Sequence, residues 1–166
     1  MKFCLVDRIE SLQPGKRIVT TKALSLAEEY LADHFPAFPV LPGVLMLEAL
    51  TQSAAWLVRV EQDFANSIIV LKKAENVRYT HFVAPGNSLR CEVDVVSIDG
   101  GSARFKGTGR VGDKLAVSAK LELACFNLAD RPALKAPAET DEAIVADLKD
   151  CFKLVRGPAA LAADAS

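Results

Sequence analysis

The chain has 166 residues, a formal net charge of −1 and 51% hydrophobic residues. This length suits one folded domain with an appendage, because two complete hydrophobic cores would exceed the usual domain size. The composition excludes a disordered chain and gives no indication of a nucleic-acid partner. The first apolar run, residues 3–6, meets Asp7 and Arg8 too soon for a secretory signal, so we expect a cytoplasmic protein.

Two short strands are predicted near the start of the chain, at residues 3–9 and 17–24, separated by the turn signal Gln13-Pro14-Gly15. A series of β-rich runs follows in the second half of the chain. In residues 90–95 polar and apolar residues alternate, which is typical of half-buried antiparallel strands. The sequence therefore predicts an antiparallel meander with runs at 67–71, 76–82, 88–98, 101–111 and 114–126.

One strong helix is predicted between these two sets of strands, from Gly43 to about Gln62. Its apolar residues cover most of the circumference, so a sheet must enclose it. A membrane span at residues 40–60 is disfavoured because Pro42, Glu48 and Arg59 interrupt it. We predict an α+β fold in which a curved antiparallel sheet of about six strands wraps a long central helix. The exposed sheet edges favour dimerisation.

A second, C-terminal amphipathic helix is predicted after a linker rich in proline and alanine at residues 129–137. Thr140 is the expected N-cap and Gly157-Pro158 the expected end, with fraying beyond Pro158. Docking on the chain's own sheet or on a dimer mate is favoured over binding another protein. We thus expect one domain at residues 1–128, followed by a linker, helix and tail at 129–166. The apolar face of this helix comprises Ile144, Val145, Leu148, Cys151, Phe152 and Val155.

The cysteines lie far apart in the sequence and form no CxxC pair, so a zinc site or a redox dithiol has little support. We expect buried, reduced thiols and neither a metal nor a cofactor. The four residues are Cys4, Cys91, Cys125 and Cys151.

The most informative segment runs from Asp33 to Glu48, where a proline recurs at every third position from 36 to 42. Each proline fixes its own φ and restricts the preceding residue, so this stiff loop delivers His34 to a defined place. Such rigidity suits a catalytic group. The alternative is a histidine with a purely structural role.

Glu48 lies in a helix whose neighbours are almost all apolar, where an unpaired carboxylate is costly to bury. On that helix it shares one stripe with Thr51, Gln52, Ala55 and Arg59, so this stripe is predicted to face a polar cavity. A cavity beside a positioned histidine indicates a site. The alternative is that Glu48 braces a loop through hydrogen bonds.

These residues resemble the signature of the 3-hydroxyacyl-acyl-carrier-protein dehydratases of fatty acid synthesis. The resemblance extends over about residues 3–126 and implies the hot-dog fold, without a membrane or nucleic-acid partner. It also implies a homodimer or a trimer of such dimers, acting on acyl chains carried by acyl-carrier protein or coenzyme A. The matching positions are His34, Phe35, Pro36, Pro39, Pro42, Gly43, Val44, Leu45, Glu48, Ala49 and Gln52.

The resemblance also implies roles in the dehydration of 3-hydroxyacyl to trans-2-enoyl thioesters. His34 acts on the Cα proton, for which an imidazole with a pKa of ~6.5 is suited, and Glu48 of the facing subunit handles the departing hydroxyl. The Gly43 N–H receives the enolate charge, and the Val44 carbonyl orients the histidine. Gln52 holds the Glu48 carboxyl, or is only a polar residue of the helix.

The chain departs from the family pattern at Asp33 and Ala37, where glycines are usual, and at His81, where arginine is common. These departures indicate a specialised or paralogous dehydratase, and a non-catalytic acyl-binding subunit is a further alternative. A hot-dog thioesterase using Glu48 and a water is another.

Three basic residues, Lys72, Lys73 and Arg78, are candidates for docking an acidic carrier protein. The alternative is that they form an ordinary solvated face.

Overall fold

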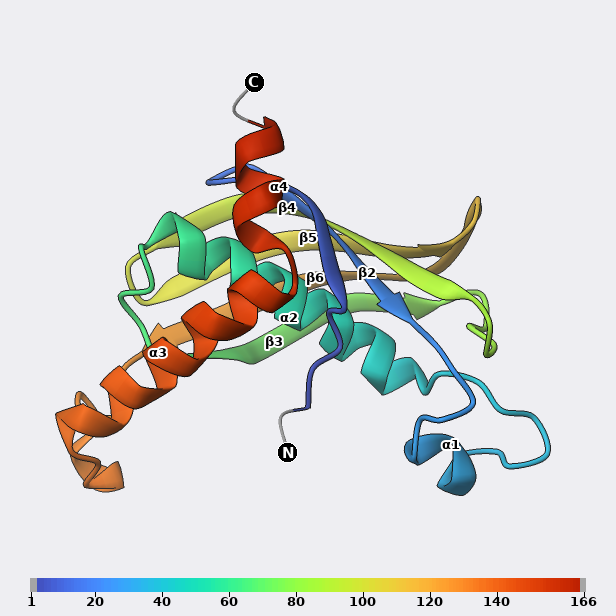
Figure 1. Cartoon of the computed structure of the whole chain (residues 1–166), viewed down its shortest axis with the longest axis horizontal. Coiled ribbons are helices and arrows are strands. Elements are labelled where there is room, and N and C mark those ends of the chain that lie inside the picture. Colours follow the sequence, from blue (N-terminus) through green and yellow to red (C-terminus); the bar gives the residue numbers. More distant parts are fainter. Residues whose placement is uncertain (1–2, 165–166) are drawn as a thin grey trace.

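The computed structural model describes residues 3–164 and shows a curved sheet around one long helix (Figure 1). The strands are β1 (Arg8–Gln13), β2 (Arg17–Ala23), β3 (Ile68–Tyr79), β4 (Ser88–Asp99), β5 (Ser102–Val111) and β6 (Lys114–Phe126). The helices are α1 (Tyr30–Asp33), α2 (Gly43–Glu61), the 3₁₀ turn η1 (Pro132–Leu134), α3 (Ala138–Leu154) and α4 (Gly157–Asp164).

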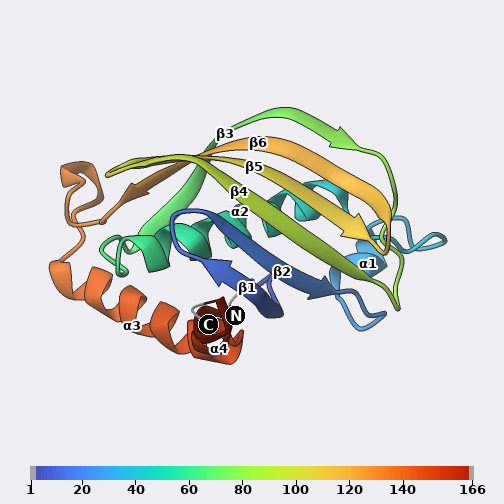
Figure 2. The same ribbon diagram turned by 90° about the horizontal axis from the view of Figure 1, so that it is seen from above.

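The central helix α2 lies in the concave side of the sheet, as Figure 2 shows. Leu50, Ala54, Leu57 and Val58 are completely buried, which confirms the prediction of an enclosed helix. Burial of this much apolar surface is the main stabilising contribution to the fold. None of the helices in residues 3–164 has both the length and the apolarity needed to cross a bilayer.

All six strands form one antiparallel sheet in the order β1-β2-β4-β5-β6-β3. The prediction of a sheet of about six strands wrapping a helix is confirmed, but the meander contains only β4, β5 and β6. β3 instead pairs with β6 and forms an edge. The predicted runs at 67–71 and 76–82 are one strand, because two register shifts, between Leu71 and Lys73 and between Glu75 and Arg78, bend it without ending it.

The first strand begins later than predicted. Residues 3–7 are not part of the sheet; instead, Leu5 and Val6 are buried beside α2 and the Leu5 N–H donates to the Gln52 side chain at 2.8 Å. The apolar run that indicated a strand therefore serves to pack this segment against the helix. Apolar pattern alone does not distinguish these outcomes.

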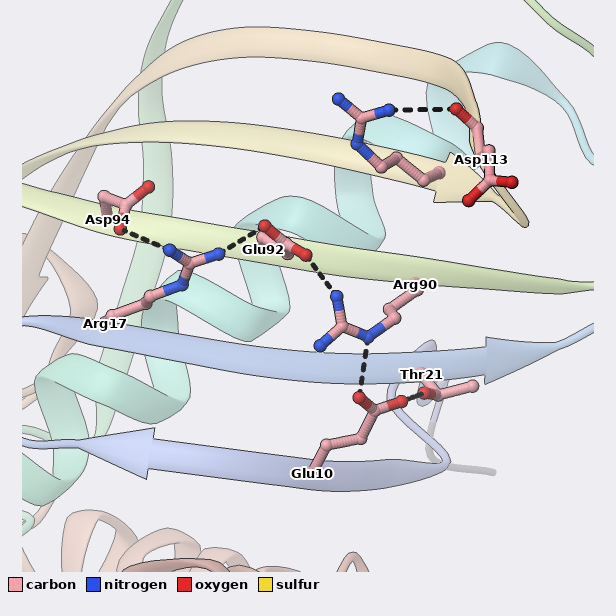
Figure 3. Close-up of polar contacts among 8 residues, drawn as sticks. Glu10, Arg17, Thr21, Arg90, Glu92, Asp94 and Asp113 are labelled. Atoms are coloured by element: carbon pink, nitrogen blue, oxygen red, sulfur yellow. Dashed lines mark hydrogen bonds and ion pairs between the residues drawn. The ribbon is translucent and has the colours of Figure 1, made fainter. Parts of the chain in front are cut away.

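The convex face of the sheet carries a chain of ion pairs across β1, β2 and β4 (Figure 3). Arg17 pairs with Glu92 and Asp94, while Arg90 pairs with Glu92 and with Glu10 at 2.7 Å. Since these side chains are largely exposed, each pair contributes about 0–1 kcal/mol. Their main effect is to favour this strand register.

The C-terminal helix α3 begins at Ala138, directly after Pro137, and not at the predicted cap Thr140. Its anchor is the buried Asp141, whose carboxylate accepts hydrogen bonds from Ser67 Oγ and from the backbone N–H groups of Leu128 and Ala129, the latter two at 2.9 Å. These bonds hold the start of α3 against the start of β3.

The other end of α3 packs against α2 through aromatic rings. Phe152 lies 5.6 Å from Trp56 and 5.7 Å from Phe64, measured between ring centroids. The helix therefore docks within its own chain, but on α2, whereas the sheet or a dimer mate was predicted.

Residues beyond Pro158 form a further helix, α4, where fraying was predicted. Gly157 permits this close turn, because a Cβ there would lie 2.0 Å from the Phe152 ring. α4 runs beside β1, and the Ile9 N–H donates to the Val155 carbonyl at 2.8 Å. The β1 edge is therefore covered, whereas β3 forms the opposite edge of the sheet (Figure 2).

The expectation of four buried thiols is wrong at Cys4, which is exposed, and Cys151 is only partly buried. Cys91 and Cys125 are buried, as expected. Cys4 is exposed because its segment lies outside the sheet.

Candidate active site

The loop that carries His34 is fixed at both ends. His34 ends α1, with its N–H donating to the Tyr30 carbonyl at 3.1 Å, and at the far end the Leu41 N–H donates to Val83 O at 2.9 Å. Between them, Phe35 adopts a φ of 51°, and the Phe38 N–H closes a turn on its carbonyl at 2.7 Å. These bonds and the prolines hold the partly buried imidazole in place.

His34 opens on a cavity of about 300 Å³, the His34 pocket, at the N-terminal end of α2. Gly43, Tyr79 and the chain's other histidine, His81, share its lining. A Cβ on Gly43 would lie 3.2 Å from the Tyr79 ring, so glycine allows the ring to lie over the helix start. As the first residue of α2, Gly43 has an N–H without an acceptor in the helix, and the helix dipole makes this end positive.

Glu48 lies on a different flank of α2, in a larger cavity of about 610 Å³, the Glu48 cavity. The predicted stripe of Glu48, Thr51, Gln52, Ala55 and Arg59 lines this cavity. A cavity along that face is confirmed, but it is polar mainly on the side of the stripe, whereas a polar cavity was predicted. Apolar residues of β3 and α3 form the opposite walls. They include Ile69, Leu71, Ile144 and Leu148.

The Glu48 carboxyl is held by the predicted neighbour, since Gln52 Nε2 donates to Glu48 Oε1 at 2.9 Å. Gln52 is itself fixed by the N-terminal segment: its Oε1 accepts from the Leu5 N–H at 2.8 Å, and its Nε2 also donates to the Phe3 carbonyl at 3.2 Å. The backbone donor settles which way the amide points. One carboxyl oxygen of Glu48 is thus engaged and the other remains available to a ligand.

Within one chain, the structure does not bring His34 and Glu48 together. The His34 pocket and the Glu48 cavity have no lining residue in common. Val44 lies on the first turn of α2 with 68% of its surface exposed, between these two regions in sequence. The implied hydrogen bond from its carbonyl to His34 stays a prediction.

Several lining residues were not anticipated from the sequence. Phe3 and Leu5 position Gln52, although their apolar run indicated a strand. Tyr79 covers Gly43 from the end of β3, a placement that depends on the β3 bulges. Trp56 also lines the Glu48 cavity. Its position one helical turn after Gln52 could have indicated this placement.

A six-stranded antiparallel sheet wrapped around one long helix defines a hot-dog protein, and the solved structures similar to this chain agree. The dehydratase heterocomplex ApeI:P from Xenorhabdus doucetiae matches with a TM-score of 0.66 at 17% identity, covering 81% of this chain and 90% of that one. Smu.793 from Streptococcus mutans, bound to acetyl CoA, matches with a TM-score of 0.57 at 12% identity, covering 76% and 93%.

Sequence comparison gives the family. The FabA-like domain matches residues 1–120. The 3-hydroxyacyl-[acyl-carrier-protein] dehydratase FabZ of Symbiobacterium thermophilum is 37% identical over 127 residues, covering 76% of this chain and 89% of that protein. The FabZ of Caulobacter vibrioides is 39% identical over 120 residues, covering 71% and 76%. The chain belongs to the FabA-like family of 3-hydroxyacyl-acyl-carrier-protein dehydratases. The family match ends before α3 and α4.

Proposed function

We propose that this protein removes water from 3-hydroxyacyl thioesters, carried on acyl-carrier protein, to give trans-2-enoyl thioesters in fatty acid or related acyl-chain synthesis. The reaction takes place in the cytoplasm, between two subunits of a homodimer. His34 of one subunit and Glu48 of its partner are the catalytic residues. The relatives that bear the dehydratase name support the reaction, and the separation of the two groups within one chain supports the subunit arrangement.

In the first half of the reaction, the neutral imidazole of His34 removes the Cα proton of the thioester. The electron pair moves onto the thioester oxygen, which gains negative charge. The Gly43 N–H at the positive end of α2 is suited to receive this charge, because it has no acceptor within the helix. Glycine at this position lets the Tyr79 ring lie against the helix start, where it forms part of the wall beside the thioester.

In the second half, the enolate re-forms the carbonyl, the Cα–Cβ double bond forms and the Cβ–O bond breaks. A protonated Glu48 supplies the proton that converts the departing hydroxyl to water. Gln52 is a positioning residue, because its hydrogen bond fixes one carboxyl oxygen and directs the other toward the substrate. Proton transfer from His34 back to Glu48 completes the cycle.

The main support for the proposal is that His34 and Glu48 lie in two separate cavities of one chain. Each chain has one His34 pocket and one Glu48 cavity on the same helix, and neither contains both groups. Because β1 is covered by α4, pairing of subunits uses the β3 edge, which is adjacent to both cavities through Ile69, Leu71 and Tyr79. An isologous pairing there gives two equivalent composite sites.

A thioesterase that uses Glu48 and water has no role for a rigidly held histidine, so the structure favours the dehydratase. Docking of an acidic carrier is best supported at Arg78. The two neighbouring lysines are already paired, Lys72 with Glu122 at 2.7 Å and Lys73 with Glu75 at 2.8 Å. Paired lysines present less net charge to an acidic carrier.

Mixing two inactive variants tests the proposal. We expect His34→Ala and Glu48→Gln each to be inactive alone. When both chains are expressed together, each mixed dimer has one intact site of two, so purified mixed dimers should recover about half of wild-type activity. The measurement is the dehydration of a 3-hydroxyacyl thioester by purified mixed dimers carrying two different affinity tags.

Mixed dimers without activity would contradict a site shared between subunits. If wild-type protein releases free thiol without an enoyl product, the dehydratase proposal is wrong and the thioesterase alternative holds. Turnover that survives His34→Ala would remove the histidine from the mechanism.

A further inference from the structure

The Glu48 cavity extends well beyond the proposed reaction. Glu48 and Arg59 lie eleven residues apart on the same stripe of α2, which corresponds to about 16 Å of helix. Both residues line the one cavity of about 610 Å³, roughly twice the size of the His34 pocket. A reacting group at Glu48 therefore has space beside it for the remainder of an elongated ligand.

The helix α3, which lies outside the family match, contributes to the wall of this cavity. Ile144, Leu148 and Cys151 of this helix contribute to the wall, and Ala55 and Ile69 line the cavity from α2 and β3. An apolar chain that leaves Glu48 along the stripe thus meets apolar side chains first and Arg59 last.

The environment of Arg59 is unusual for a charged side chain. Its Nε is buried without a hydrogen-bond partner among the described residues, and no carboxylate of residues 3–164 forms an ion pair with it. The contact that remains is the Trp56 ring, 5.2 Å from the guanidinium carbon. Burial lowers the pKa of Arg59 to about 10, so the group remains charged at neutral pH. The side chain as a whole is partly buried, and desolvation of a cation without an anion beside it is costly.

We propose that Arg59 receives the distal end of an acyl chain that carries an acidic group, so that the substrates of this enzyme are ω-carboxyacyl thioesters. This inference rests on the proposed dehydration at Glu48. A planar guanidinium binds a carboxylate through two parallel hydrogen bonds, whereas a methyl-ended chain leaves the cation unpaired. The inference thus takes the substrate class from the one cation of the cavity. Asp147 of α3 also lines the cavity, but this carboxylate is itself engaged in an interaction.

A free fatty acid is an alternative ligand, because its carboxylate can also bind to Arg59. In that orientation, however, its methyl end points toward Glu48 and Gln52, the polar end of the cavity. An ω-carboxyacyl thioester has polar groups at both ends and an apolar middle, as the cavity does. We therefore assign the cavity to the substrate, and not to a regulatory fatty acid.

The first experiment compares two 3-hydroxyacyl thioesters of equal length, one with a terminal carboxylate and one with a terminal methyl group. We expect wild type to favour the carboxylate in kcat/KM, and Arg59→Met to lower that preference roughly 10- to 100-fold by losing a charge-assisted hydrogen bond. Arg59→Lys keeps the charge and is the matched control, retaining much of the preference. The same preference in wild type and Arg59→Met would overturn the inference.

The second experiment measures binding without turnover and uses Trp56, the only tryptophan of the chain. The probes are saturated N-acetylcysteamine thioesters with a terminal carboxylate or methyl group, and a free monocarboxylic acid of the same length. We expect the carboxylate-ended thioester to change Trp56 fluorescence with the highest affinity, and Arg59→Met to weaken it roughly 10- to 100-fold. Equal binding of the two thioesters would contradict the inference.

Tighter binding of the free acid, also lost in Arg59→Met, would overturn the substrate assignment in favour of a regulatory fatty acid. A protein that dehydrates neither hydroxyacyl substrate but binds the carboxylate-ended probe through Arg59 would refute the proposed function and support the ligand class. A protein that dehydrates both hydroxyacyl substrates with equal kcat/KM would support the proposed function and refute the ligand class. Thermal melting of both variants checks that they fold.

Discussion

The His34 pocket and the Glu48 cavity lie along the same helix, but they are built differently. The first is formed by a proline-stiffened loop and the end of β3, and it contains the chain's two histidines. The second is about twice as large, combines α2, β3 and α3, and contains two carboxyls and an arginine. In the proposed mechanism, the pocket supplies the base and the cavity supplies the acid.

We infer from this difference that the His34 pocket determines the reaction, and that the Glu48 cavity determines which substrate is recognised. The His34 pocket lies within the region matched by the family, whereas part of the wall of the Glu48 cavity comes from α3, beyond that region. Changes in the pocket are therefore expected to alter the chemistry. Changes in the far wall of the cavity are expected to alter which acyl chain is accepted.

The largest expected effect comes from removing either catalytic group. His34→Ala and Glu48→Gln should each lower kcat by about 10²- to 10⁴-fold, since each eliminates one proton transfer. The thermal midpoint should change little, because neither side chain is fully buried. Steady-state formation of the enoyl product measures the effect. Full activity in either variant would show that its cavity takes no part in the reaction.

A smaller effect is expected at the helix start, within the His34 pocket alone. Gly43→Ala places a Cβ about 3.2 Å from the Tyr79 ring and displaces it. We expect kcat/KM to fall roughly 10- to 100-fold through misplacement of the thioester. Adding Tyr79→Ala removes the clash and should restore part of the activity. No coupling between the two substitutions would contradict this account.

The Asp141 hydrogen bonds that fix the start of α3 can be tested without changing the His34 pocket. The hydrogen bond from Ser67, followed by those from Ala129 and Leu128, lowers the pKa of Asp141. Its contribution to stability is therefore present above the unfolded-state pKa of about 3.9 and is lost as the pH falls through the lower folded-state pKa.

Asp141→Asn should lower the thermal midpoint at pH 7, and this difference should shrink in acid below about pH 4. Glu142→Gln, an exposed change at the next position, is the matched control. A difference from wild type that is constant from pH 7 to acid would contradict the role of the carboxylate.

The smallest effect concerns the thiols. Cys4 is exposed and lines the mouth of the Glu48 cavity, whereas burial raises the pKa of Cys91 to about 12. A maleimide at neutral pH should therefore label Cys4 and leave Cys91 unmodified until the protein unfolds. Mass spectrometry of digested protein locates the label. Labelling should slow turnover only in part, and Cys4→Ser should abolish that inhibition.

Much of this fold could be predicted because its signals are local. The helix at Gly43 and the strands at 88–98, 101–111 and 114–126 agree with the structure within one residue, since their periodicity and turn residues are unambiguous. The short run at residues 3–6 misled the prediction of β1, because an apolar segment can pack against a helix as well as form a strand. Fraying after Pro158 was also wrong, because the contact between Gly157 and Phe152 is tertiary.

In the candidate site, too, only the features with local sequence signals could be predicted. The stripe that links Glu48, Gln52 and Arg59 follows from helical spacing, and the cavity confirms it. The wall opposite that stripe depends on where α3 docks. One determinant of this docking is the hydrogen bond between Asp141 and Ser67, which lies 74 residues earlier, just before β3. Pattern alone indicated that α3 was amphipathic, but contained no signal for which surface it covers.

The covering of β1 by α4 also limits how these molecules can associate. A sheet with two open edges can recruit further copies at both ends and grow into a fibre, whereas a sheet with one open edge is complete after a single twofold pairing. The eight-residue helix α4 thus keeps the β1 edge from pairing with a strand of another chain. Its removal is expected to expose this edge and to promote aggregation.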